Sequence, residues 1–200
     1  MKRLAPDPDG IAEAAEALRR GAIVAYPTET VYGLAVDPFQ EDALRRLFAA
    51  KQRDPQHPIL LIIADESQLP PVVARVSPRA HAYARAFWPG PLSLVLPKAP
   101  GLSALAAAGT DTICVRCPGS PIARDLCRRF GAALTSTSAN LSGEPAARSL
   151  DEIRLPGIEL GLDGGLLPES APSTVFDPET GQLYREGAIP VARLQSVPHE

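Results

Sequence analysis

The chain has 200 residues, of which 45% are hydrophobic and 22% charged, and this composition suits one α/β domain over residues 1–200. Its formal net charge of −3 gives no overall attraction to nucleic acid, which disfavours a non-specific RNA-coating protein. No apolar run approaches the roughly 18 residues that a membrane span needs, and residues 1–6 do not lead into a signal core. We therefore expect a soluble cytoplasmic protein without a membrane partner.

Hydrophobic periodicity and turn residues predict the elements in chain order. Helices are expected at residues 11–18, around 44–48, at 78–88 and at 121–130; strands are expected at 22–25, 59–63, 92–96, 112–117, 132–135, 173–176 and 182–185. Ser77 and Ser120 each precede a proline and are typical N-caps, while Gly21 and Gly131 are placed to end helices. Because strands and helices alternate without a strict βαβ order, we expect an open, twisted mixed sheet with helices on both faces.

A polar turn follows the first strand, which should end about Pro27 because proline cannot continue a central ladder. Thr28, Glu29, Thr30 and Tyr32 then lie where an open α/β sheet usually places a ligand, beyond the carboxyl end of a strand. A simple turn with a helix or turn cap explains the same residues. The role of Glu29 stays open among a base, a structural partner and a bystander.

Cys114 and Cys117 have the spacing of a metal or redox pair, but no second pair accompanies them. On a strand, residues three apart point to opposite faces, so the two thiols should diverge. We interpret both as small buried hydrophobes in a reducing compartment.

Cations and hydroxyls make up the remaining polar inventory. Lys51 and Arg53 end the second helix, where cations also complement the helix dipole. Arg116 lies inside an apolar strand and needs an anion, which a ligand or an acidic side chain would supply equally well. A hydroxyl-rich turn at 135–143 includes Ser138 and Asn140, and Ser173 and Arg185 follow near the C-terminus.

The usual nucleotide-binding loops and serine-nucleophile motifs do not occur in this sequence. Cations together with neutral hydroxyls favour an enzyme that positions and neutralises a triphosphate, without covalent chemistry by its side chains.

Seven short segments, spread in order over residues 10–190, resemble the YrdC-like family. They are Pro27–Leu34, Lys51-x-Arg53 with His57-Pro58, Trp88–Leu92, Val115–Pro118, Thr137–Gly143, Ser173–Val175 and Arg185–Gly187. The resemblance is closest to the family's threonylcarbamoyl-adenylate synthase branch, of the single-domain TsaC type.

The resemblance implies a YrdC-like domain and a nucleotidyltransferase that condenses L-threonine, bicarbonate and ATP to threonylcarbamoyl-AMP and diphosphate. This product serves threonylcarbamoyladenosine (t6A) modification of tRNA, so tRNA and the threonylcarbamoyl-transfer complex are implied partners. ATP is implied as a substrate with Mg²⁺, with no metal held by side chains and no tightly bound cofactor.

By position, the resemblance assigns residues to three roles. Lys51 and Arg53 are implied as catalytic; Thr28, Thr30, Tyr32, Arg116 and Ser173 as the threonine side; and Lys51, Arg53, Ser138, Asn140 and Arg185 as the nucleotide side. Two departures from the family pattern lie beside charged contacts: Gln52-Arg-Asp54 replaces Gly-Arg-Pro, and Glu186 replaces a proline.

Two alternatives remain. One is a non-catalytic YrdC-like protein that binds double-stranded RNA or tRNA, and the other is a paralogue that acts on another carbamoyl acceptor, since fold likeness does not fix a substrate.

Overall fold

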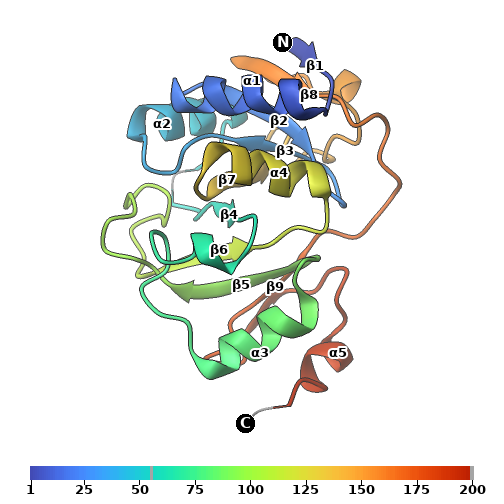
Figure 1. The fold of residues 1–200 in the computed structure, drawn as a ribbon. Coiled ribbons are helices and arrows are strands. Elements are labelled where there is room, and N and C mark those ends of the chain that lie inside the picture. The colour runs from blue at the N-terminus through green and yellow to red at the C-terminus, as the bar shows by residue number, and fades with distance from the viewer. Residues whose placement is uncertain (55, 199–200) are drawn as a thin grey trace.

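The computed structural model describes residues 1–54 and 56–198; Pro55 and residues 199–200 lie outside the described residues. The described part of the chain forms a mixed sheet with α-helices around it (Figure 1). The strands are β1 (Lys2–Leu4), β2 (Ile23–Pro27), β3 (Tyr32–Ala35), β4 (Leu60–Ile62), β5 (Leu92–Pro97), β6 (Thr112–Arg116), β7 (Leu134–Ser138), β8 (Ile158–Leu162), β9 (Thr174–Phe176) and β10 (Leu183–Arg185). The helices are α1 (Pro8–Arg19), α2 (Glu41–Lys51), α3 (Pro78–Phe87), α4 (Pro121–Phe130) and α5 (Val191–Gln195), with short 3₁₀ turns η1 (Glu66–Gln68) and η2 (Leu150–Glu152).

The strands have the order β1-β8-β2-β3-β7-β4-β6-β5-β9-β10. Strand β8 pairs in parallel with β1 and β2, β4 with β6, and β5 with β9, while the other neighbours are antiparallel. The predicted mixed sheet is therefore confirmed.

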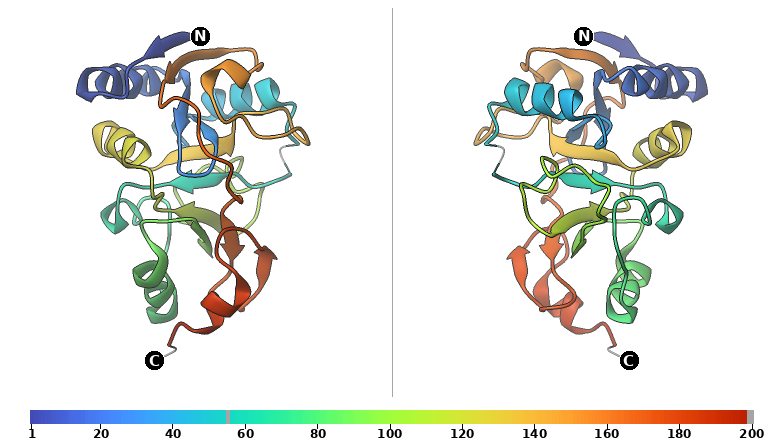
Figure 2. Two further views of the ribbon diagram at one scale, coloured as in Figure 1. Left: turned by 90° about the vertical axis from the view of Figure 1, so that its right-hand side faces the viewer. Right: turned by 90° about the vertical axis from the view of Figure 1, so that its left-hand side faces the viewer.

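Helices cover both faces of this sheet. Figure 2 shows α1, α3 and α4 on one side and α2 on the other. The residues of β2 divide between two cores: Val24 and Tyr26 pack with α1 and α4, whereas Ile23 and Ala25 belong to the cluster that contains α2. This division follows from the period of two along a strand, and it confirms the expected layers.

The helix ends follow the local signals in the sequence. The hydroxyls of Ser77 and Ser120 accept hydrogen bonds from the backbone N–H of Ala80 and Ala123. A proline begins each of these helices. Proline has no backbone N–H, and none is needed there, because the first N–H groups of a helix have no carbonyl partner within it. Gly131 ends α4 with φ 91°, a left-handed conformation that costs glycine little.

Two strand boundaries differ from the expectations. Tyr32 is not in the polar turn but begins β3, which pairs antiparallel with β2 and leaves residues 28–31 as the loop. Strand β7 does not end at Thr135 but continues to Ser138. Cross-strand partners bond to two of its hydroxyls: Thr135 Oγ1 accepts from Val36 N at 2.8 Å, and Ser136 Oγ accepts from the Tyr26 hydroxyl at 2.7 Å. A polar strand is stable where such partners exist.

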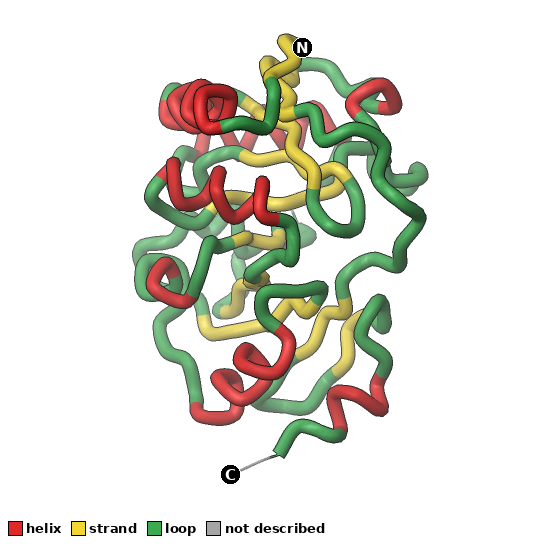
Figure 3. Tube along the Cα trace, turned by 45° about the vertical axis from the view of Figure 1, so that its right-hand side comes forward, coloured by secondary structure: helices red, strands yellow, loops and turns green. Residues whose placement is uncertain are grey.

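A long connection joins β8 to β9, which lie far apart in the strand order. Figure 3 shows it as a loop that runs along the side of the molecule, from the end that holds the N-terminus toward the end that holds the C-terminus. This segment passes the cavity described next and contributes Glu169, Ser170 and Ser173 to its wall.

Candidate active site

A cavity of about 1090 Å³ lies against the central strands of the sheet. Its floor includes alternate residues of two strands, Ser93 and Val95 of β5 and Thr112, Cys114 and Arg116 of β6. These residues share a face because alternate side chains of a strand point the same way. The expected position is confirmed in part: the residue 28–31 loop, Arg116 and Ser138 lie at the carboxyl ends of β2, β6 and β7, while the rest of the floor is a face of the sheet.

Hydrogen bonds to Thr28 shape the loop between β2 and β3 at the cavity wall. Its hydroxyl donates to the carbonyl of Val31 at 2.6 Å and accepts from the N–H groups of Thr30 and Val31, both at 3.1 Å. The hydroxyls of Thr28 and Thr30 lie 3.0 Å apart, and both residues line the cavity. The loop is therefore a turn held by its own side chain that still presents polar groups to a ligand.

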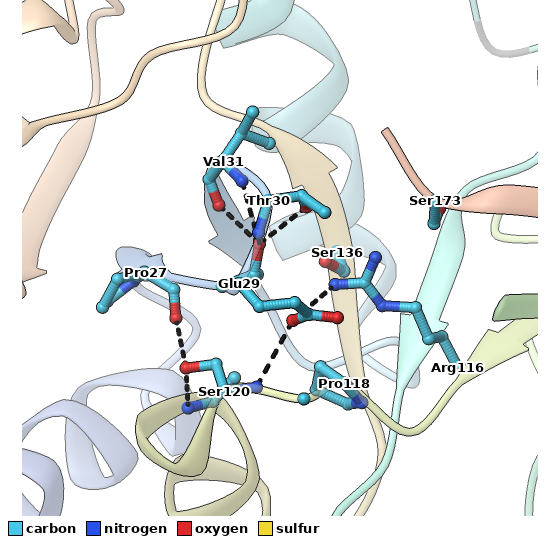
Figure 4. A network of polar contacts seen from close by, with 12 residues as sticks. Pro27, Glu29, Thr30, Val31, Arg116, Pro118, Ser120, Ser136 and Ser173 are labelled. Carbon is cyan, nitrogen blue, oxygen red and sulfur yellow. Dashed lines mark hydrogen bonds and ion pairs between the residues drawn. The ribbon is translucent and has the colours of Figure 1, made fainter. Parts of the chain in front are cut away.

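Arg116 and Glu29 form an ion pair beside the cavity, with 3.2 Å between Nη2 and Oε2 (Figure 4). Only 3% of the arginine side chain is exposed, compared with 25% of the glutamate. The same Glu29 oxygen accepts from the N–H of Ser120 at 3.3 Å, next to the start of α4. Arg116 Nε and Glu29 Oε1 are both buried without a hydrogen-bond partner. The arginine therefore has a structural partner and still keeps donor capacity.

Ser173 connects Arg185 to the floor of the cavity. Its hydroxyl accepts from Ser93 Oγ at 3.0 Å and from Arg185 Nη2 at 3.1 Å, and Arg185 Nε donates to its carbonyl at 3.0 Å. Burial lowers the pKa of Arg185, and the charge of Arg116 lowers it further. All three residues line the cavity.

Lys51 lies behind the wall of the cavity rather than on it. Its ammonium group donates to the backbone carbonyls of Ser138 and of Asn140, the second at 2.6 Å. Only 2% of Lys51 is exposed, and burial followed by the charge of Arg53 lowers its pKa to about 8. The lysine thereby holds the end of β7 and the turn that follows it, and Ser138, the last residue of β7, lines the cavity.

Two other predicted residues are also absent from the cavity lining in the described part of the chain. The side-chain amide of Asn140 donates to the carbonyls of Leu141 and Glu144, and its oxygen is buried without a partner. The Tyr32 hydroxyl accepts from Gly164 N and donates to the Gly165 carbonyl, both at 2.9 Å. These contacts place Asn140 and Tyr32 as supports for loops that border the site.

Arg53 reaches the cavity as expected, and its Nη2 donates to the carbonyl of Pro58 at 2.9 Å. Burial lowers its pKa, and its Nε is buried without a partner. Arg148 is a fourth cavity arginine that the sequence did not reveal. It donates to the Leu167 carbonyl and forms an ion pair with Glu169, both at 3.0 Å. No motif marks Arg148, because the turn that positions it depends on the distant β8–β9 connection.

Cys114 also lines the cavity, which corrects the expectation that both cysteines are core hydrophobes. The strand period does place it with Arg116, opposite Val115, and Cys117 lies in the core on the other face as expected. Burial raises the pKa of the Cys114 thiol to about 12. The three cysteines Cys114, Cys117 and Cys127 are free.

The fold and the site together define an open-sheet α/β protein whose polar cavity carries the guanidinium groups of Arg53, Arg116, Arg148 and Arg185. Such a set matches the carboxylate and phosphate groups of anionic small molecules. The family model for Sua5, YciO and YrdC proteins, described as telomere recombination, matches residues 16–187, and the chain belongs to this family.

Curated relatives cover most of the chain. The threonylcarbamoyl-AMP synthase of Chromohalobacter salexigens is 41% identical over 179 residues, which are 88% of this chain and 97% of the relative. That of Methylococcus capsulatus is 42% identical over 175 residues, or 86% and 94% of the two chains.

A solved structure of P. abyssi Sua5 complexed with L-threonine superposes with a TM-score of 0.91 at 35% identity and covers 98% of this chain. The present chain spans 59% of that longer protein. Among the described residues, each helix is too short or too polar to cross a membrane.

Proposed function

We propose that the chain is an L-threonylcarbamoyladenylate synthase, a nucleotidyltransferase that converts L-threonine, bicarbonate and ATP to threonylcarbamoyl-AMP and diphosphate. The observation that carries the proposal is the cavity with four arginines in a chain 41% identical to a synthase of that name. Its volume of about 1090 Å³ is slightly above the roughly 300–1000 Å³ of ordinary small-molecule pockets. That size supports the binding of two substrates at once.

The threonine side would consist of Arg116, Ser173 and the loop that carries Thr28 and Thr30. A guanidinium group binds the carboxylate of the amino acid, and Arg116 has nitrogen donors beyond the one that Glu29 uses. The neighbouring hydroxyls can bond to the threonine hydroxyl and amine. That L-threonine is bound by the similar P. abyssi Sua5 supports this assignment.

The nucleotide side would consist of Arg53, Ser138 and Arg185, with Lys51 and Asn140 fixing the turn beside them. Arg53 is half-buried, and this strengthens its interaction with phosphate charge because the local dielectric constant is lower than in water. Arg185 is more exposed and adds a second cation, which Ser173 holds in place. In the proposed reaction the threonine nitrogen attacks bicarbonate to give a carbamate and water. A carbamate oxygen then attacks the α-phosphorus of ATP, the bond to the β-phosphate oxygen breaks, and diphosphate leaves.

Charge accumulates on the phosphates in this step, and fixed cations that stabilise it lower the barrier. Lys51 would act through its ammonium charge and its hold on the Ser138 and Asn140 carbonyls. We propose that Mg²⁺ enters with the ATP phosphates and that no covalent intermediate forms on a side chain.

The product would supply the t6A modification of tRNA, which makes tRNA and the transfer complex downstream partners. Three free cysteines accord with the reducing cytoplasm as the site of this reaction.

The test is diphosphate release from ATP, measured with and without L-threonine and bicarbonate, together with identification of the nucleotide product. The expected result is release that requires both co-substrates and yields threonylcarbamoyl-AMP. Salt-dependent tRNA binding without threonine-dependent release would instead favour the non-catalytic RNA-binding alternative. Release that depends on another amine would favour the paralogue.

A further inference from the structure

Tyr184 is an exposed aromatic residue at the wall of the cavity. It lies in β10, the last strand of the sheet, and 56% of its surface is exposed. Single exposed aromatics are common on protein surfaces and alone indicate nothing. Tyr184 differs because it lines the cavity, whereas the exposed Phe39 does not.

An irregularity in the strand pairing explains how Tyr184 reaches the cavity. Leu183 pairs with Phe176, and Arg185 pairs with Val175, so two steps along β10 correspond to one step along β9. Tyr184 is the extra residue of this bulge. In a regular strand, adjacent side chains point to opposite faces. Here both Tyr184 and Arg185 line the cavity, which is the kind of redirection that bulges produce beside binding sites.

The neighbouring contacts limit what Tyr184 can bind. The guanidinium group of Arg185 is fixed beside the Tyr184 ring, because Ser173 accepts hydrogen bonds from it through both its hydroxyl and its carbonyl. An anionic ligand on Arg185 that also carried a flat apolar group could place that group against the tyrosine. Of the proposed substrates, threonine and bicarbonate have no flat apolar group, and ATP has adenine.

We propose that Tyr184 is the stacking platform for the adenine ring of ATP, with Arg185 beside it on the phosphate side. This assignment rests on the proposed function and names the residue of this chain that recognises the base. When a base covers the half-exposed ring, mainly apolar ring surface is removed from water. Base–aromatic stacking is favourable for every nucleobase.

Kinetics of diphosphate release provide the first test. Replacement Tyr184→Ala should raise the KM for ATP about tenfold, the lower part of the range expected for one lost stacking contact. The KM for threonine should stay at the wild-type value. Tyr184→Phe keeps the ring and should keep the KM for ATP, and Phe39→Ala is the matched control for loss of an exposed aromatic. An unchanged KM for ATP in Tyr184→Ala would overturn the proposal.

Direct binding separates this inference from the proposed function. The chain has one tryptophan, Trp88, so Tyr184→Trp adds a reporter whose signal is read against the wild-type protein. ATP and adenosine should quench the new fluorescence, and inorganic tripolyphosphate should not. If ATP quenches the fluorescence but the protein releases no diphosphate, the stacking role of residue 184 is supported and the proposed synthase function is rejected. If diphosphate release depends on threonine but ATP does not quench the fluorescence, the synthase function is supported and the stacking role is rejected.

Discussion

Glu29 and Arg116 join two segments that are far apart in sequence, and their ion pair borders the proposed threonine side (Figure 4). The pair decides the role of Glu29 in the fold, because one carboxylate oxygen holds both Arg116 and the backbone N–H of Ser120. Gly119 lies against the same side chain, since a Cβ added there would meet the Glu29 carboxyl carbon at 3.3 Å. The segment of Gly119 and Ser120 thus packs directly against the Glu29 carboxylate.

Replacement Glu29→Ala should lower the free energy of unfolding by about 2 kcal/mol, because it leaves the buried Arg116 charge without its partner. It should also raise the KM for threonine more than it changes kcat, since the guanidinium loses its fixed orientation. Glu29→Gln keeps an acceptor oxygen and should restore part of both properties. Urea unfolding and diphosphate-release kinetics measure the two effects. Equal effects of the two variants would contradict a role in orienting Arg116.

Replacement Tyr32→Phe removes a hydroxyl that holds two backbone groups of the loop after β8. We expect a loss of about 1–2 kcal/mol in the free energy of unfolding, because the Gly164 N–H and the Gly165 carbonyl lose their partner. The KM for threonine should rise only a few-fold, since Tyr32 does not line the cavity. A large loss of threonine affinity at unchanged stability would show instead that the hydroxyl contacts the substrate.

The sequence predicted elements well where the signal is local. The two serine-proline helix starts and Gly131 depend on neighbouring residues alone, and the boundaries of α3 and α4 agree with them to within a residue. Strand β3 was missed because its pairing with β2 reverses the chain over four residues that resemble a ligand-binding turn. Strands β1 and β8 were missed as well, and they pair only through contacts distant in sequence.

The candidate site was predictable in part for the same reason. Arg116 could be recognised because an arginine in an apolar strand needs an anion, but the sequence could not choose between Glu29 and a ligand. In the structure Arg116 Nη2 pairs with Glu29, while Arg116 Nε has no hydrogen-bond partner, so the arginine has an acidic partner and can still donate to a ligand. Arg148 and Tyr184 could not be found, because a long connection positions the first and a strand bulge redirects the second.

The Cys114 thiol should react slowly even though it lines the cavity. Burial raises its pKa to about 12, so at pH 8 the reactive thiolate is on the order of 10⁻⁴ of the population. Burial also raises the pKa of Cys117, to about 11. Iodoacetamide should therefore label the folded protein much more slowly than the urea-unfolded chain, and Cys114→Ala should retain diphosphate release. Rapid labelling of Cys114 in the folded state, blocked by ATP or threonine, would contradict this expectation.

Lys51 should govern both activity and the pH dependence of stability. Replacement Lys51→Met keeps an apolar stem but removes the donors to the Ser138 and Asn140 carbonyls. We expect a loss of about 100-fold or more in kcat/KM, the order found when a fixed group that stabilises transition-state charge is removed. The variant should remain folded by circular dichroism, so that the loss is one of catalysis. Wild-type turnover by Lys51→Met would reject the assignment of Lys51 to the reaction.

The pKa of Lys51 gives the sign of the pH effect. It is about 8 in the folded protein, below the ordinary value of 10.5, so the unfolded chain holds more protons between these two values. Below pH 8 the cost of burying the charged group is fully present, and it is relieved as the pH rises toward 10.5. Urea unfolding at pH 7 and 9.5 should therefore show the wild type gaining stability relative to Lys51→Met. The rate of diphosphate release should fall as the pH rises from 7 to 9.5, because the ammonium charge of Lys51 is lost above about pH 8. Parallel pH dependence of stability in the two proteins would mean that Lys51 titrates normally.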